Sequence, residues 1–182
     1  MGKETNDFIK ELRKGRPAVQ QRLLNDYGPA VFRLIVRMVG QQEDAEEIYQ
    51  DVFVKALTKI HTFDPEKASL QTWLGRIAYN EAVNHLRHSR LDIVFMDDDT
   101  LATDFEYEPD DTGSDGQTVM LLEQAIQLLP AADQTLLSLF YYENMSMKEI
   151  AYITGSIPST IGSRLSRIRK KLYQTIMQFS DK

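Results

Sequence analysis

A strongly acidic segment divides this chain of 182 residues into two parts. Residues 92–116 contain ten Asp and Glu residues, one Pro and two Gly, and their large apolar residues are scattered without helical spacing. A segment of that composition cannot bury enough apolar surface to form a core. We therefore expect a mostly disordered linker over residues 92–116, with one folded module in residues 1–91 and another in residues 117–182.

The net charge of −6 conceals an uneven distribution of charged residues. Between Leu91 and Met147 there is no Lys or Arg, whereas thirteen acidic residues occur there. The rest of the chain carries all 21 basic residues against 14 of the 27 acidic ones, a balance of +7. The overall charge argues against nucleic-acid binding, but the charges of the two modules are compatible with it.

Several classes of function lack the residues that they need. The chain has no cysteine, which excludes disulfides, zinc knuckles, iron–sulfur sites and thiol catalysis. No apolar run is long enough for a membrane helix, and the N-terminus lacks the apolar core of a secretory signal. His85 and His88 lie three residues apart without an evident third metal ligand. Since no phosphate-binding loop and no paired nucleophile and base occur either, we expect a cytoplasmic protein that is not an enzyme and needs no metal or cofactor.

The first module has the apolar spacing of amphipathic helices and no convincing strand alternation. One helix is expected over residues 17–40, with Gly28 and Pro29 interrupting or kinking it. A second is expected over about residues 43–60, because acidic residues at its start complement the helix dipole. A third is expected over residues 69–90, with one apolar face directed inward.

A polar row follows the third expected helix on the face opposite its apolar stripe. Arginine and amide side chains can hold phosphates and hydrogen-bond bases, and an aromatic ring nearby can stack on a base. A solvated helix face, with the tryptophan in the core, explains the same pattern without DNA. The row and its neighbouring aromatic residues are Phe63, Thr72, Trp73, Arg76, Asn80, Asn84, Arg87 and His88.

The second module ends in a pattern typical of a helix-turn-helix. Ser146 and Glu149 have the spacing of a capping box at the start of a short helix, which Gly155 ends. A longer basic helix opens near Pro158, and this order is the one with which many proteins place a helix in the DNA major groove. An ordinary amphipathic hairpin with a basic solvated face is the alternative. The polar residues expected on the outer face of the long helix are Ser159, Thr160, Ser163, Arg164, Arg167, Lys170 and Lys171.

Two sets of motifs, taken together and in this order, resemble the bacterial extracytoplasmic-function sigma factors of RNA polymerase. The first set resembles their region 2 and comprises GQQEDAEEIYQDVF at residues 40–53, Phe63-Asp64-Pro65, and WLGRIAYN at residues 73–80. The second set resembles their region 4 and comprises residues 128–151, which end in MSMKEIA, and SRLSR at residues 163–167. The resemblance extends over about residues 24–172, and an isolated helix-turn-helix would not also carry the Asp-Ala-Glu-Glu helix.

The resemblance implies an all-α protein of two small helical domains. Residues 1–91 would form the region 2 bundle and residues 117–182 the region 4 helix-turn-helix, joined by the acidic flexible linker 92–116. Such a protein is a non-enzymatic subunit that binds core RNA polymerase and promoter DNA. Region 2 would dock on the clamp coiled coil and take up the non-template strand of the −10 element, whereas region 4 would read the −35 element and touch the flap. The resemblance also implies an anti-sigma factor as a partner.

The resemblance assigns individual residues to three surfaces. Polymerase docking falls to Asp44, Glu47, Gln50 and Asp51. Binding of the −10 element falls to Phe63, Lys67, Ser69, Thr72, Trp73, Arg76, Asn80, Asn84 and Arg87. Binding of the −35 element falls to Lys148, Ser159, Thr160, Ser163, Arg164, Arg167, Lys170 and Lys171.

The sequence departs from the family pattern at a few of these positions. Residues 65–70 lack one aromatic residue that the family often has, and Asn84 stands where Asp is common. Ser159 and Gly162 replace a frequent Gly and Lys in the long basic helix. These departures leave the promoter sequence open. A stand-alone dimeric helix-turn-helix regulator and a helical adaptor that binds only protein are alternatives, but the first gives the acidic helix no role and the second does not explain the cationic face.

Overall fold

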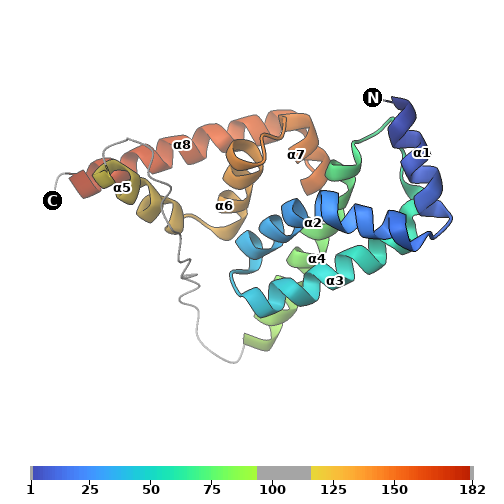
Figure 1. Ribbon diagram of the computed structural model, residues 1–182. Helices are drawn as coiled ribbons and strands as arrows, with labels where there is room; N and C mark the ends of the chain where they lie inside the picture. The colour runs from blue at the N-terminus through green and yellow to red at the C-terminus, as the bar shows by residue number, and fades with distance from the viewer. Residues whose placement is uncertain (1, 94–115, 181–182) are drawn as a thin grey trace.

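The computed structural model describes residues 2–93 and 116–180, which form helices and no strands (Figure 1). The first group of helices is α1 (Gly2–Arg13), α2 (Pro17–Val39), α3 (Gln42–Lys59), the 3-10 turn η1 (Ile60–Thr62) and α4 (Leu70–Ile93). The second group is α5 (Gly116–Gln127), α6 (Ala131–Leu137), the π-helical segment η2 (Ser138–Tyr142), α7 (Met147–Thr154) and α8 (Pro158–Ser180). The all-α, two-domain prediction is confirmed, whereas residues 94–115 of the predicted linker lie outside the described residues.

The first domain is a bundle in which α2, α3 and α4 pack on one another. Ile35, Val52 and Leu74 come from these three helices and are essentially inaccessible to solvent, as the apolar spacing predicted. Helix α1 is not among the helices expected from the sequence, although Ile9 and Leu12 have helical spacing and both are buried. Helix α1 therefore belongs to the folded bundle.

Helix α2 is continuous through Pro29, so of the two effects predicted for Gly28 and Pro29, an interruption or a kink, the interruption does not occur. The neighbouring Gly28 has a different role, because the Tyr49 hydroxyl of α3 lies 2.5 Å from the point where a Cβ on Gly28 would be. Real Cβ atoms do not tolerate so short a contact. Gly28 therefore leaves room for the Tyr49 hydroxyl beside α2.

The second domain contains the predicted helix-turn-helix. Ser146 and Glu149 form a complete capping box at the start of α7, and Gly155 ends the helix with a φ of 68°. The apolar stripe of α8 is buried at Ile161 and Leu165, and continues toward the C-terminus with α5 packed beside it. The capping box, the helix-ending glycine and the apolar spacing were therefore sufficient to predict this helix-turn-helix from the sequence.

The helix that begins after Pro130 changes its geometry in its second half. Helix α6 ends at Leu137 and continues as the π-helical segment η2. Tyr141 and Tyr142, at the end of this segment, are both exposed. The wider π turn therefore directs these rings out of the core of their own domain.

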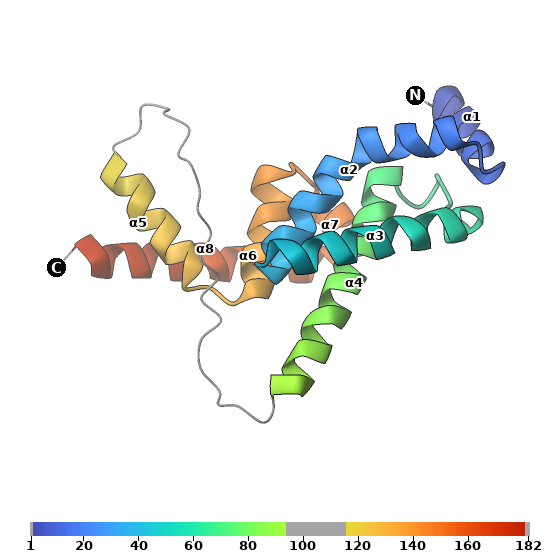
Figure 2. The same ribbon diagram turned by 60° about the horizontal axis from the view of Figure 1, so that its bottom comes forward.

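The two domains are in contact with each other. Helix α7 packs against α4, and α6 packs against α2 (Figure 2). Within the described part of the chain, no helix has both the length and the apolar character required to cross a membrane.

Candidate nucleic-acid interface

The polar row of α4 is divided between solvent and the second domain. Asn80, Asn84 and Arg87 are exposed, as predicted for side chains that could meet a nucleic acid. Arg76 is exposed overall, but it donates a hydrogen bond of 3.0 Å to the carbonyl of Tyr152 in α7 and lies 4.9 Å from the centre of that ring. The open part of the row therefore begins after Arg76.

Three residues expected in the binding row are buried. Phe63 is 3% exposed and Trp73 is 8% exposed, and their rings pack edge to face with centroids 5.5 Å apart. Thr72 is 1% exposed, so the prediction that it lies on the outer face of α4 is wrong. The reason is tertiary, because α7 covers the start of α4 and removes Thr72 from solvent.

The loop between η1 and α4 is held by hydrogen bonds at several points. The Asp64 carboxylate accepts the Glu66 backbone N–H at 3.0 Å and lies 3.2 Å from the Lys67 ammonium group. The Glu66 N–H, followed by Lys67, lowers the pKa of Asp64 below its ordinary value. Ser69 accepts the Thr72 N–H at 3.1 Å at the start of α4. Lys67 and Ser69 themselves are exposed, as predicted.

Glu149 links the cap of α7 to α4. Its carboxylate accepts the backbone N–H of Ser146 at 2.9 Å and the Ser146 hydroxyl at 2.7 Å. Its other oxygen accepts the Thr72 hydroxyl at 3.2 Å. These hydrogen bonds, the one from the Ser146 backbone first, hold the pKa of Glu149 below its ordinary value. Glu149 is therefore best suited to this position when it is ionised.

A second polar contact joins the domains at the end of η2. Arg33 of α2 donates two hydrogen bonds, of 3.1 and 3.3 Å, to the two oxygens of Glu143. The Glu143 side chain is only 8% exposed, and Arg37 lies 3.7 Å from it. Arg37 also donates to the Ser138 hydroxyl and stacks on the Tyr142 ring at 4.5 Å. The pKa of Arg33 is raised, chiefly by its hydrogen bond to Glu143.

The outer face of α8 has the composition that the sequence predicted, with one exception. The exception is Arg164, whose Nε donates a hydrogen bond of 2.7 Å to Asp133 of α6. The prediction that Arg164 lies free on the outer face is therefore wrong, since this helix packs against α6. The residues of α8 that are exposed as predicted are Ser159, Thr160, Ser163, Arg167, Lys170 and Lys171. Lys148 of α7 is exposed as well.

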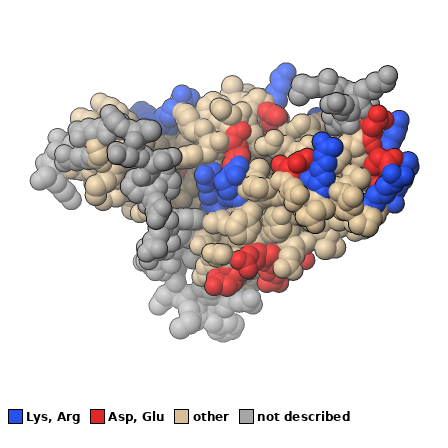
Figure 3. All heavy atoms as spheres, viewed as in Figure 1, with Lys and Arg blue, Asp and Glu red and all other residues tan. Residues whose placement is uncertain are grey.

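An acidic surface lies over α3 on the lower side of the molecule (Figure 3). Glu47, Gln50 and Asp51 are exposed on it, as predicted for a docking face. Val54, one helical turn further, is 65% exposed although it is apolar. Asp44 differs from the others, because its carboxylate lies 3.2 Å from the His85 ring nitrogen of α4.

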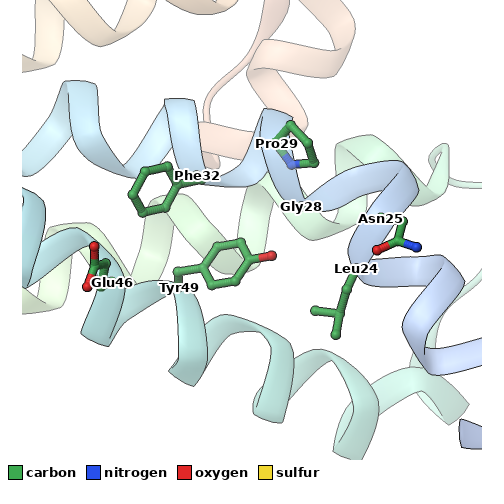
Figure 4. A pocket seen from close by; sticks show the side chains of 7 residues that line it. All are labelled: Leu24, Asn25, Gly28, Pro29, Phe32, Glu46 and Tyr49. Atoms are coloured by element: carbon green, nitrogen blue, oxygen red, sulfur yellow. The ribbon is translucent and has the colours of Figure 1, made fainter.

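A groove of about 570 Å³ runs between α2 and α3 beside this acidic surface. Figure 4 shows Tyr49 lying across it with the hydroxyl directed toward Gly28, and Glu46 at one end. Partial burial raises the pKa of Tyr49 above its ordinary value. The described residues contain no cluster of three or more His, Cys, Asp or Glu side chains that could hold a metal ion.

Sequence reasoning missed the partners that hold these surfaces in place. Asp133 and Glu143 were counted only as part of the acidic span, and no role was given to Arg33. Nothing in the spacing of these residues indicates which arginine each carboxylate meets, because the partners lie 31 and 110 positions apart. The burial of Thr72 had no sequence signal for the same reason.

Comparison with known families identifies both domains. Residues 23–91 match the family model of Sigma-70 region 2, and residues 120–172 match that of Sigma-70, region 4. The two matches occur in the same order as the two motif sets of the sequence. Together they include α4 with its polar row and the helix-turn-helix of α7 and α8.

Individual proteins match over most of their length. The ECF RNA polymerase sigma factor SigW of Bacillus subtilis is 28% identical over 90% of this chain and 92% of its own. The ECF RNA polymerase sigma factor RpoE of Cereibacter sphaeroides is 30% identical over 84% of this chain and 83% of its own. The solved structure of the sigma factor RpoE in complex with the anti-sigma factor NepR from Bartonella quintana superposes with a TM-score of 0.70, at 25% identity, over 89% of this chain and 98% of that one.

Proposed function

The chain belongs to the extracytoplasmic-function sigma factors of the sigma-70 family, and we propose that it directs transcription initiation through two separate DNA-binding surfaces, one on α4 and one on α8. As a sigma factor it is a transcription initiation factor that acts with core RNA polymerase on promoter DNA. We assign region 2 to residues 1–91 and region 4 to residues 117–182. Its activity would then be cytoplasmic and non-catalytic, since polymerase supplies the chemistry.

The observation that carries the assignment is the exposed cationic face of α8 behind the capped helix α7. Ser159, Thr160 and Ser163 lie in the first two turns, where a recognition helix meets base edges. Arg167 follows one turn later with its guanidinium exposed, and such a group binds guanine with two hydrogen bonds. Lys170 and its neighbour lie near the point where the helix would leave the groove, so they would contact phosphates.

The −10 surface would be the exposed part of α4 and the loop before it. Asn80, Asn84 and Arg87 offer amide and guanidinium groups that suit bases and phosphates of a single strand. Lys67 at the loop adds a cation. Since Phe63 packs on Trp73, we assign these two rings to shaping the loop rather than to stacking on a base.

Polymerase docking would use the exposed face of α3. Glu47, Gln50 and Asp51 form its polar part, and Val54 adds apolar area that docking could bury. Carboxylates beside an apolar side chain suit a basic partner helix such as the clamp coiled coil of the polymerase. Asp44 would instead steady α3 against α4 through His85.

An anti-sigma factor is a further partner that we propose. The RpoE of Bartonella quintana was solved in complex with the anti-sigma factor NepR, and its chain has the same fold as this one. Region 4 would contact the polymerase at the flap, in addition to the contact of region 2 with the clamp coiled coil.

Gel filtration with core polymerase, followed by transcription in vitro from genomic fragments, tests the assignment. We expect a stoichiometric complex that initiates at a discrete set of promoters. A stand-alone regulator would instead bind duplex DNA without polymerase, and an adaptor would bind no promoter at all. Either result would refute the proposed function.

A further inference from the structure

The start of α7 places an exposed apolar side chain beside the recognition helix. Helix α7 packs against α8 near the beginning of that longer helix (Figure 1). The Met147 sulfur lies 3.2 Å from the point where a Cβ on Gly162 would be. Met147 is nevertheless 44% exposed, so the contact with α8 covers only part of its side chain. A thioether therefore lies open at the side of α8.

Helical geometry relates Gly162 to the side chains that we assign to base edges. At 3.6 residues per turn, each residue is rotated by about 100° from the one before it. Gly162 is therefore rotated by about 60° from Ser159 and by about 100° from Ser163, and both of these serines are exposed. Met147 thus borders the face of α8 that would enter the major groove.

The absence of a side chain at position 162 keeps the Met147 sulfur uncovered. A Cβ at 3.2 Å from this sulfur would be closer than most real Cβ contacts, so a longer side chain would have to displace Met147. Glycine is unfavourable in the interior of a helix, and α8 carries it here next to the exposed thioether. Gly162 and Met147 therefore form one apolar notch at the edge of the reading face.

We propose that Met147 recognises a thymine of the −35 element by apolar contact with its C5-methyl group. The inference rests on the proposed assignment of α8 to the −35 element. The methyl group of thymine is presented in the major groove, where apolar side chains distinguish it from the other bases. Methionine suits this contact because its side chain is long, flexible and polarisable. Lys148, the next residue, is exposed and would meet a phosphate at the same edge.

Removing single methyl groups from the DNA tests this contact directly. The preferred −35 element is first selected from a randomised library, and each thymine on either strand is then replaced by deoxyuridine, which lacks only the methyl group. Affinity is measured by competition with holoenzyme assembled from core polymerase and the full-length protein. The parent should lose affinity by about threefold or more at one position, which is the effect expected for burying one methyl group.

Variants of Met147 should change this discrimination at the same position. Met147→Ala should bind thymine and deoxyuridine equally there, whereas Met147→Leu, which keeps an apolar side chain, should retain the preference. Met147→Gln has a similar length but a polar end, so it should lose the preference and serves as the second variant should the alanine form fold poorly. Gly162→Gln should lose it too, because the longer side chain displaces Met147.

Two controls separate this contact from general effects on binding. The thymine-to-deoxyuridine ratio is compared within each variant, so a change in overall affinity does not alter it. Met177 is the matched residue, because it is 45% exposed but lies about 22 Å further along α8 than Gly162. Met177→Ala should therefore keep the parent ratio at every position.

Two results would overturn the role of Met147. One is equal binding of thymine and deoxyuridine by the parent at every position. The other is loss of discrimination in Ile157→Ala but not in Met147→Ala, since Ile157, in the turn before α8, is also apolar and 61% exposed.

Arg167→Ala tests the underlying assignment of α8 separately. If this variant keeps the full −35 preference, α8 does not read the element and the proposed function of this helix fails. If it loses the preference while the parent is insensitive to deoxyuridine, only the role of Met147 is refuted.

Discussion

Replacing Arg164 with alanine should cost stability rather than promoter preference. The sequence pattern places Arg164 among the base-reading residues of the recognition helix. In the structure, however, its Nε donates to Asp133 at 2.7 Å, and the Asp133 side chain is 19% exposed. The guanidinium therefore links α8 to α6 within region 4.

The size of the effect follows from the geometry of this ion pair. A hydrogen bond between two charged groups contributes about 1.5–3 kcal/mol when it is shielded from water. The Arg164 side chain is 39% exposed, so solvent screening reduces the contribution to about 1–2 kcal/mol. For a protein of this length, such a loss lowers the melting temperature by about 2–8 °C.

Two measurements on the full-length protein check the prediction. A double-mutant cycle of Arg164→Ala and Asp133→Ala, followed by thermal unfolding, should show a coupling free energy of about 1 kcal/mol or more. Transcription from a randomised −35 library should give the same sequence preference for Arg164→Ala as for the parent. Arg167→Ala is the matched control, since its side chain is exposed on the same helix, and it should leave stability unchanged while weakening −35 preference.

The opposite pattern would refute this reasoning. If Arg164→Ala melts like the parent and loses preference at one −35 position, the arginine reads a base. The ion pair with Asp133 would then be too weak to determine its role.

Three further predictions concern other parts of the molecule. Reversing Glu47 and Asp51 to lysine should weaken core polymerase binding by about 2 kcal/mol without loss of helicity in circular dichroism, and parent-like binding would mean that α3 is not the docking face. Gly28→Ala should lower the melting temperature because Tyr49 lies in the way of a Cβ, and a second change, Tyr49→Phe, should restore it; no rescue would contradict the close-approach argument. Glu149 has a lowered pKa in the folded protein, so its stabilising effect is present above the ordinary carboxyl pKa of 4.5 and is lost as the pH falls through the folded value. Glu149→Gln should therefore melt below the parent at neutral pH, with a difference that shrinks in acid; a constant difference would contradict this.

The cap of α7 and the apolar stripe of α8 could be predicted from the sequence because both depend on residues close together in the chain. Ser146 and Glu149 are three positions apart, so their hydrogen bonds form whenever that turn is helical. Ile161 and Leu165 are one turn apart and share a face of any helix that contains them. Even α1, which was missed, carried such a signal in its apolar spacing.

Contacts between helices could not be read from the chain, because the order of residues does not specify which faces meet. Thr72 has the spacing of an exposed residue on α4, and only the packing of α7 buries it. Arg164 and Arg167 lie three positions apart with the same side chain, yet one meets Asp133 and the other is exposed. The sequence by itself therefore determined most of the helices, the two domains and the family. The tertiary structure decided which arginines pair within the protein, because a guanidinium binds whichever carboxylate the packing of the helices places within about 3 Å of it.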